Sequence, residues 1–213
     1  MKTTGLALSA LAVAAILSVA ASAQLTLDQF TGTPHVKTLP PSQIDKHYEP
    51  LPQGSLLGAY RYTIFEVQEV GTYGQSSTLD IGNGVCIVDS GFQNDSSLQI
   101  FYGTNKKEEV PLGLNLGAYS GLQLNFAGVI SAQGIDVVVE IWPSSGGYYA
   151  LGQEVATNGS SFTVGFPFTG FTGAGGTLTQ AETTDISYIV IVIEGSGDPD
   201  ITDSFAITSF QAY

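Results

Sequence analysis

Basic side chains are scarce in this 213-residue chain, which has six Lys and Arg residues against nineteen Asp and Glu, a formal net charge of −13. So few cations cannot displace the counterions of a phosphate backbone, which argues against nucleic acid as a partner. The single cysteine excludes an intrachain disulfide framework. Long helices are not expected either, because 26 glycines and 9 prolines are poor helix formers.

Charged residues make up only 12% of the chain, whereas 43% of the residues are hydrophobic, which is enough to build a core. The first residues have the pattern of a secretion signal: Lys2, an apolar stretch over residues 6–20, then Ala21-Ser22-Ala23. An apolar stretch of about 15 residues is short for a membrane span. We therefore expect residues 1–23 to be cleaved. The secreted, extracellular product has 190 residues (213 less 23), a formal charge of −14 and no membrane span.

Residues 24–213 form one expected domain, in which apolar and polar residues alternate with period 2 between turn residues. The clearest alternation is in residues 135–142, where one face carries Ile135, Val137, Val139 and Ile141, and the other carries Asp136, Val138, Glu140 and Trp142. Residues 186–193 are apolar on both faces, which predicts a central strand covered on both sides. Further candidate strands are 25–30, 59–70, 78–81, 85–89, 98–102, 122–126, 148–154, 162–166 and 205–213. About ten short strands of this kind predict an all-β sandwich or barrel.

Residues 31–53 differ from the rest of the domain. They contain five prolines and both histidines of the chain. Because proline lacks the backbone donor and fixes φ, this segment is expected to be a proline-rich arm at a sheet edge or an extended surface loop.

Three stretches resemble the jelly-roll domains of secreted bacterial proteins. Residues 55–62 (Ser-Leu-Leu-Gly-Ala-Tyr-Arg-Tyr) resemble the Gly-Gly-x-Arg sequence that begins a strand in these proteins, many of which end in a PEP-CTERM sorting tail. Residues 114–124 are similar to the Leu-Ser-x-Tyr-x-Gly-Leu-Arg segment of galactose-binding-like jelly rolls, a group that includes carbohydrate-binding modules and the CIA30-type domain. Residues 185–193, followed by 205–210, resemble the paired closing strands of the same fold.

This resemblance implies a single antiparallel β-sandwich of the jelly-roll type, similar to a carbohydrate-binding module. The sequence departs from the pattern at Ala59, where a second Gly is usual, at Tyr62, where an acid often follows the Arg, and at Thr208, where the closing strand often has an Asp. It also lacks the PEP-CTERM sorting tail. One sandwich hosts many functions, so the resemblance indicates a fold rather than a ligand.

The candidate ligand-binding face lies around Trp142. Trp142 ends one predicted strand, residues 143–147 form a turn, and Tyr148 and Tyr149 begin the next strand. In a hairpin, Trp142 and one of the two tyrosines lie nearly opposite each other, on the face that also carries Asp136 and Glu140. Rings that stack on sugars beside carboxylates that accept their hydroxyls form a common kind of carbohydrate site. The alternative is a cross-strand aromatic pair that stabilises the hairpin by roughly 0.5–1 kcal/mol without a ligand.

A structural Ca²⁺ ion is the candidate cofactor. Asp198, Asp200 and Asp203 lie in one acidic loop, and Ca²⁺ prefers oxygen ligands. The resemblance implies a calcium between the first and last strands, which adds Asp28 to the candidate ligands, whereas Thr208 removes one. The alternative is a solvated acidic loop without an ion, because the spacing is not that of an EF-hand.

Catalytic motifs are absent from the sequence, so we expect no catalytic residues. Asp136 and Glu140 are four residues apart on one strand, on the order of 13 Å. Paired glycosidase carboxyls are closer, at roughly 5–5.5 Å or 6.5–9.5 Å. His35 and His47 belong to no His-Glu-x-x-His motif, and Cys86 lies in an apolar run typical of a buried thiol.

The sequence therefore predicts a secreted, non-catalytic β-sandwich that binds carbohydrate or another extracellular surface, with an extracellular glycan or matrix as its partner. One alternative is a structural or matrix protein that self-associates through its sheet edges. Another is a glycan-active hydrolase whose carboxylates come together only in the fold. The acidity favours neutral, cationic or calcium-bridged partners.

Overall fold

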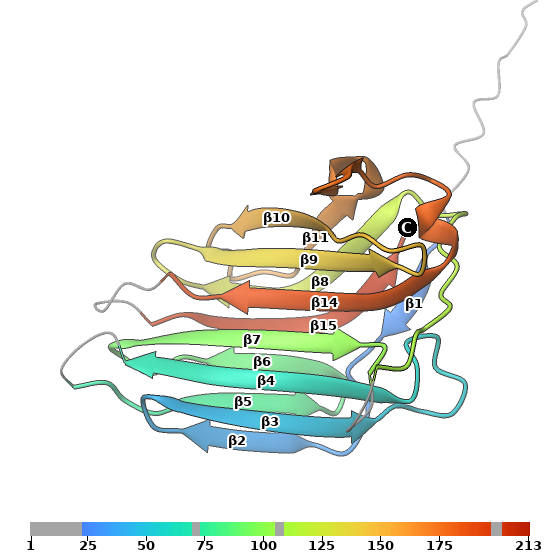
Figure 1. Ribbon diagram of the computed structural model, residues 1–213. Coiled ribbons are helices and arrows are strands. Elements are labelled where there is room, and N and C mark those ends of the chain that lie inside the picture. The colour runs from blue at the N-terminus through green and yellow to red at the C-terminus, as the bar shows by residue number, and fades with distance from the viewer. Residues whose placement is uncertain (1–22, 70–72, 105–108, 197–201) are drawn as a thin grey trace, which may run out of the picture.

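The computed structural model describes residues 23–69, 73–104, 109–196 and 202–213, which form two antiparallel β-sheets packed face to face (Figure 1). The predicted all-β antiparallel sandwich is confirmed. All but the last residue of the predicted leader lie outside the described residues. In the part of the chain that the structure describes, no helix has the length and apolar character needed to cross a membrane.

The strands divide between the sheets as follows. The seven-stranded sheet consists of β1 (Leu25–Asp28), β2 (His35–Leu39), β5 (Ser77–Gly82), β6 (Val85–Asp89), β8 (Gly121–Ile130), β11 (Phe162–Pro167) and β15 (Ser204–Ala212). The eight-stranded sheet consists of β3 (Gln43–Pro50), β4 (Tyr60–Glu69), β7 (Asn94–Tyr102), β9 (Ile135–Pro143), β10 (Tyr149–Val155), β12 (Thr172–Gly173), β13 (Gly176–Thr177) and β14 (Ile186–Glu194). Two short 3-10 helices, η1 (Phe168–Gly170) and η2 (Glu182–Thr184), lie between strands.

The spatial order of the strands differs from their order in the chain. The seven-stranded sheet runs β11-β8-β15-β6-β5-β2, with β1 paired to β15, and the eight-stranded sheet runs β13-β12-β10-β9-β14-β7-β4-β3. Figure 1 looks onto the eight-stranded sheet, with β9, β14, β7, β4 and β3 one above another in front. Residues far apart in sequence therefore become neighbours on its outer face.

The core lies between the sheets and follows the predicted alternation. The inward side chains of β9 and β14 are buried: Ile135, Val137, Val139, Ile141, Ile186, Ile189, Ile191 and Ile193. Strand β14 is central, between β9 and β7, as expected. The expectation that β14 is covered on both sides is wrong, because Tyr188 and Val192 on its outer side are only half-buried. Its outer apolar residues instead form part of a surface.

Residues 31–53, expected to form a loop or an edge arm, contain two edge strands. Strand β2 pairs with β5 at the edge of one sheet, and β3 pairs with β4 at the edge of the other. The prolines permit this because Pro34, Pro40 and Pro41 flank β2 and Pro50 ends β3, and edge or terminal positions tolerate a missing donor. The segment therefore crosses from one sheet to the other.

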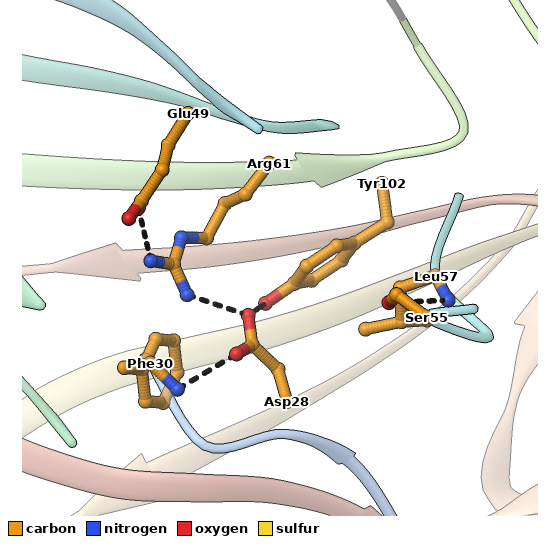
Figure 2. Close-up of polar contacts among 7 residues, drawn as sticks. All are labelled: Asp28, Phe30, Glu49, Ser55, Leu57, Arg61 and Tyr102. Atoms are coloured by element: carbon orange, nitrogen blue, oxygen red, sulfur yellow. Dashed lines mark hydrogen bonds and ion pairs between the residues drawn. The ribbon is translucent and has the colours of Figure 1, made fainter. Parts of the chain in front are cut away.

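A buried polar cluster joins the two sheets around Arg61 (Figure 2). Arg61, on β4, is fully buried and donates to Asp28 Oδ2 at 2.7 Å and to Glu49 Oε2. Asp28, on β1 of the other sheet, also accepts hydrogen bonds from the Tyr102 hydroxyl at 2.8 Å and the Phe30 N–H at 2.7 Å. Burial opposes the charged guanidinium, but Asp28 and Glu49 outweigh that cost, and the pKa of Arg61 is raised.

The stretch that resembles the jelly-roll pattern, residues 55–62, positions this arginine. The Ser55 hydroxyl oxygen accepts a hydrogen bond from the Leu57 N–H at 3.2 Å (Figure 2). Gly58 then has φ of +84°, in the region that favours glycine. The chain enters β4 with Arg61 turned inward and Tyr62 turned outward. The acid that often follows the arginine is not needed here, because Asp28 and Glu49 provide the negative charge from other strands.

Candidate functional site

A row of aromatic rings crosses the outer face of the eight-stranded sheet. Tyr48 on β3 lies opposite Tyr62 on β4, and Tyr62 lies opposite Phe101 on β7. The ring centroids of Tyr48 and Tyr62 are 4.1 Å apart with an interplanar angle of 13°, and those of Tyr62 and Phe101 are 5.4 Å apart. All three side chains are half-buried, so ring surface stays exposed on the outside of the sheet.

Further rings continue this surface across β14 and β9. Tyr188 on β14 pairs with Trp142 on β9. The Trp142 ring lies 4.9 Å from the ring of Tyr148, tilted by 49°. Trp142 and Tyr188 are half-buried, and Tyr148 is exposed. We call the six side chains the aromatic face: Tyr48, Tyr62, Phe101, Trp142, Tyr148 and Tyr188.

A hollow of about 370 Å³ lies within the aromatic face. It is lined by Tyr62, Phe101, Tyr102, Thr104, Glu109, Trp142, Tyr188 and Val190. Sites for small ligands typically measure about 300–1,000 Å³ and combine apolar walls with a few polar groups. Thr104 and Glu109, joined by an isolated β-bridge, supply polar groups here. The hollow therefore has the size and lining of a ligand site.

Two carboxylates bind tyrosine hydroxyls around the hollow. The Tyr188 hydroxyl donates to Glu109 Oε2 at 3.1 Å, and the Tyr148 hydroxyl donates to Glu140 Oε1 at 2.8 Å. The hydrogen bond to Glu140 is the main reason that the pKa of Tyr148 is raised, whereas burial, and then Glu109, raises the pKa of Tyr188. Both hydroxyls therefore stay protonated at neutral pH. Each carboxylate has acceptor lone pairs beyond the one that its tyrosine uses.

The structure brings together three of the five predicted ligand-binding residues, Trp142, Tyr148 and Glu140. Tyr149 lies on the opposite face of β10: it pairs with the inward Ile141, is only 7% exposed, and donates its hydroxyl to Glu182 Oε1 at 2.6 Å. The pleat places consecutive residues on opposite faces, so only one of the two tyrosines can accompany Trp142. Tyr149 is a residue of the core and not of the aromatic face.

Asp136, the fifth predicted residue, is on the outer face but not beside Trp142. The two are six positions apart along β9, a distance of about 20 Å. Asp136 lies directly opposite Glu154 on β10 and Glu194 on β14. It therefore belongs to an acidic row at the far end of the strands.

The structure does not bring the four predicted calcium ligands together. Asp198 and Asp200 lie outside the described residues. Asp28 lies beside the C-terminal half of β15, whereas Asp203 directly precedes that strand, so the two are roughly 20 Å apart and cannot bind one ion. Asp28 is ion-paired with Arg61. Within the described ranges, no three or more His, Cys, Asp and Glu side chains form a group that could hold a metal ion.

Cys86 is a buried, free thiol on β6, as its apolar surroundings predict. Burial is the main cause that raises the pKa of its thiol to about 12. The nucleophilic form of cysteine is the thiolate, which this site disfavours. Cys86 therefore packs as a small hydrophobic residue.

Four members of the aromatic face were not identified from the sequence: Tyr48, Tyr62, Phe101 and Tyr188. Three of them lie in predicted strands, and Tyr48 lies in the segment expected to be a loop or an edge arm. The sequence shows that each of these segments contains an aromatic residue, which is the only indication of the aromatic face that it gives for them. What the sequence lacked was the order and register of the strands, which decide whether such residues meet.

No family model matches the sequence, and no curated protein matches it. Among solved structures, the chain is similar to an agarase, with a TM-score of 0.45 and 9% identity over 89% of this chain and 24% of the agarase chain. It is also similar to the family 11 carbohydrate-binding module of a cellulosomal cellulase of Clostridium thermocellum (TM-score 0.41, 10% identity, 90% of this chain and 95% of that chain). A third structure is TmCBM61 in complex with β-1,4-galactotriose (TM-score 0.36, 9% identity, 88% of this chain and 97% of that chain).

These neighbours include carbohydrate-binding modules and domains related to glycoside hydrolases. The chain spans only about a quarter of the agarase that it matches. Likeness this distant assigns no ligand, so the function must come from the side chains of the aromatic face.

Proposed function

We propose that this protein is a secreted, non-catalytic β-sandwich that binds a neutral carbohydrate through its aromatic face. The observation that carries the proposal is the hollow in which Trp142, Tyr188 and Phe101 present ring surface beside Glu109. The C–H face of a sugar ring is apolar and can stack on such rings, while sugar hydroxyls donate to carboxylates. Both features of a sugar thus find a complementary group within one hollow.

Charge supports a neutral glycan over an anionic one. The two carboxylates that bind tyrosine hydroxyls at the aromatic face belong to Glu109 and Glu140. The whole chain carries a formal charge of −13. Uronate or sulfate groups are repelled by such a surface, whereas uncharged hydroxyls are not. Secretion, and the resemblance to CIA30-type and PEP-CTERM-type proteins, remain predictions from the sequence.

The test is affinity electrophoresis in native gels that contain soluble polysaccharides. The panel contains neutral β-glucans, galactans and mannans, with polygalacturonate as the anionic member. We expect at least one neutral polysaccharide to retard the protein. Trp142→Ala should weaken that binding tenfold or more, which corresponds to about 1.4 kcal/mol. The thermal midpoint should fall by only a few degrees, because a cross-strand aromatic pair contributes up to about 1 kcal/mol.

The matched control is Tyr73→Ala, which removes an aromatic ring that is 80% exposed but is not part of the aromatic face. This variant should bind like the wild type. Equal weakening by both substitutions, or intact binding in Trp142→Ala, would show that the aromatic face is not the binding site.

Self-association through sheet edges is the alternative function, and charges on two of the four edge strands oppose it. The edge strands β2 and β3 carry Lys37, Asp45 and Lys46. Charges on edge strands oppose the addition of another strand. We expect a monomer at all concentrations in sedimentation velocity. Oligomers that grow with concentration, in a protein that no glycan retards, would favour the structural alternative.

A hydrolase needs two carboxylates close to the bound sugar. Asp136 and Glu154 lie opposite each other across β9 and β10 and line a hollow of about 220 Å³. Both are exposed, and Asp136 is about 20 Å along β9 from Trp142, so a sugar stacked on that ring does not reach them. We therefore expect no reducing sugar to be released from a bound polysaccharide. Release that is abolished by Glu154→Gln, or by Glu140→Gln or Glu109→Gln at the aromatic face, would favour the hydrolase.

A further inference from the structure

Two carboxylates converge where β14 ends and the chain turns towards β15. Asp203 Oδ2 lies 2.6 Å, and Asp95 Oδ1 2.8 Å, from the point that a Cβ on Gly195 would occupy. The two oxygens are therefore no farther apart than the sum of these distances. Asp95 belongs to β7 in the eight-stranded sheet, whereas Asp203 directly precedes β15 in the seven-stranded sheet. The pair thus lies between the two sheets, at one end of the sandwich.

Each carboxylate has an oxygen that is buried without a partner. No hydrogen bond from the described residues reaches Asp95 Oδ1 or Asp203 Oδ1. Asp203 is only 3% exposed, and its Oδ2 already accepts hydrogen bonds from the Ser196 N–H at 2.7 Å and the Ser196 hydroxyl at 3.1 Å. An ionised carboxylate only accepts hydrogen bonds, whereas a protonated carboxyl also donates one. The two acids can therefore bond to each other only if one of them carries a proton.

No basic side chain of the described residues lies near enough to neutralise the pair. Residues 62–105 and 108–213 contain no Lys, Arg or His, and Lys106 and Lys107 lie outside the described residues. Lys46 on β3 is two strands from Asp95 and four positions farther along, roughly 16 Å away. The other described basic residues lie on β2, β3 and β4, where they pair with other acids or stack on each other: His35, Lys37, His47 and Arg61.

The charged side chains described on the neighbouring strands at this end are acids. Glu66 lies on β4, Asp89 on β6 and Glu194 on β14. A nearby like charge disfavours the ionised form of an acid, and so does burial. Burial, followed by Asp203 and Glu194, raises the pKa of Asp95. Asp95 therefore takes up a proton at a higher pH than an ordinary aspartate does.

We propose that Asp95 and Asp203 form a pH-sensitive joint between the two sheets. Asp95 takes its proton from the solvent, because it is only half-buried, and donates a hydrogen bond to the unpartnered Oδ1 of Asp203. When Asp95 loses this proton, two carboxylates face each other and their repulsion weakens the joint. The joint therefore closes in acid and loosens at neutral pH.

Acid should accordingly stabilise this end of the protein. In the unfolded chain Asp95 has the ordinary pKa of about 3.9, whereas in the folded protein its pKa is raised. Below the ordinary value Asp95 is protonated in both states, and the joint contributes its full stabilisation. As the pH rises through the raised pKa, the unfolded state loses its proton more readily, so stability falls.

The direct test is an NMR titration of the side-chain carboxyl carbons from about pH 3 to about pH 8, on both sides of the ordinary aspartate pKa. EDTA is present throughout, so that no divalent cation binds the acids. We expect Asp95 to titrate at a higher pH than Asp80, a half-buried aspartate on β5 whose cross-strand neighbours, Val36 and Ile87, are uncharged. Asp203→Asn should lower the titration midpoint of Asp95, because it removes the nearest negative charge.

The second test is the thermal midpoint of Asp95→Asn at two pH values, again in EDTA. At about pH 7.5 the variant should melt roughly 2–4 °C above the wild type, because its amide is uncharged and can donate to Asp203. At about pH 4 the difference should disappear, because Asp95 of the folded wild type is then protonated.

The matched control is Asp80→Asn, which removes the same charge from a site without acidic neighbours and should shift the midpoint equally at both pH values. An Asp95 carboxyl that titrates together with Asp80 would overturn the proposal. So would a midpoint difference in Asp95→Asn that does not change with pH. If Asp203→Asn fails to fold, the wild-type titration and Asp95→Asn decide the outcome. Neither measurement involves a carbohydrate, so a negative result leaves the proposed function untouched.

Discussion

The two sides of strands β3, β4 and β7 carry different chemistry at the same level of the sheet. The inward residues at this level form the buried polar cluster: Glu49, Arg61 and Tyr102. The outward residues form part of the aromatic face: Tyr48, Tyr62 and Phe101. Each outward residue is the chain neighbour of an inward one. The same stretches of backbone therefore carry a buried polar cluster on one side of the sheet and exposed rings on the other.

On the inner side, the charged groups bind one another. The Arg61 guanidinium is shared between Asp28 and Glu49, and the Tyr102 hydroxyl donates to Asp28. On the outer side, the rings of Tyr48 and Tyr62 stack on each other but remain half-exposed. The inner groups thus stabilise the fold, whereas the outer rings leave apolar surface exposed.

The largest expected effect comes from the inner side. Arg61→Met leaves Asp28 and Glu49 buried without their cation, and the free energy of unfolding should fall by about 3–5 kcal/mol. Urea denaturation measures the loss. Lys37→Met, which removes a half-exposed cation on β2, should stay within about 0.5 kcal/mol of the wild type. A loss below 1 kcal/mol in Arg61→Met would show that the cluster does not hold the sheets together.

The next effect comes from the outer side of the same strand. Tyr62→Ala removes two cross-strand ring contacts of about 0.2–1 kcal/mol each, so the loss of stability should be smaller than in Arg61→Met. Binding to the polysaccharide that retards the wild type should weaken tenfold or more, as measured by affinity electrophoresis. A variant that loses stability like Arg61→Met but binds normally would contradict the division between the two sides.

The smallest change is the removal of a single hydroxyl from each side. Tyr102→Phe deletes a buried hydrogen bond to the Asp28 carboxylate and should cost about 1.5–3 kcal/mol. Tyr148→Phe deletes an exposed hydrogen bond to Glu140 and should change stability by less than about 0.5 kcal/mol. Paired urea titrations measure both. Equal losses in the two variants would remove the distinction between buried and exposed hydroxyls.

The sequence predicts features that depend on local pattern. The alternation in residues 135–142 places the buried and outward side chains of β9 correctly, because the pleat requires only neighbouring residues. The strands β2 and β3 were not predicted, because their prolines favour a loop unless a sheet edge is available. Edge positions depend on the whole topology, which no local pattern contains.

The candidate site depended on contacts between distant strands. Trp142, Tyr148 and Glu140 meet within one hairpin, so turn and alternation were enough to suggest them. Tyr188 and Tyr62 join them only through the order β9-β14-β7-β4, because they lie 46 and 80 positions from Trp142 in the sequence. The resemblance of residues 55–62 to a jelly-roll motif predicted the start of a strand, but not the buried ion pairs of Arg61.

The most direct test of the aromatic face uses the fluorescence of Trp142, the only tryptophan in the chain. Because this ring lines the hollow, a bound neutral oligosaccharide should change its emission saturably, with the same Kd that calorimetry gives for binding. Unchanged Trp142 emission while calorimetry records saturable binding would contradict the account, because the sugar would then bind away from the aromatic face.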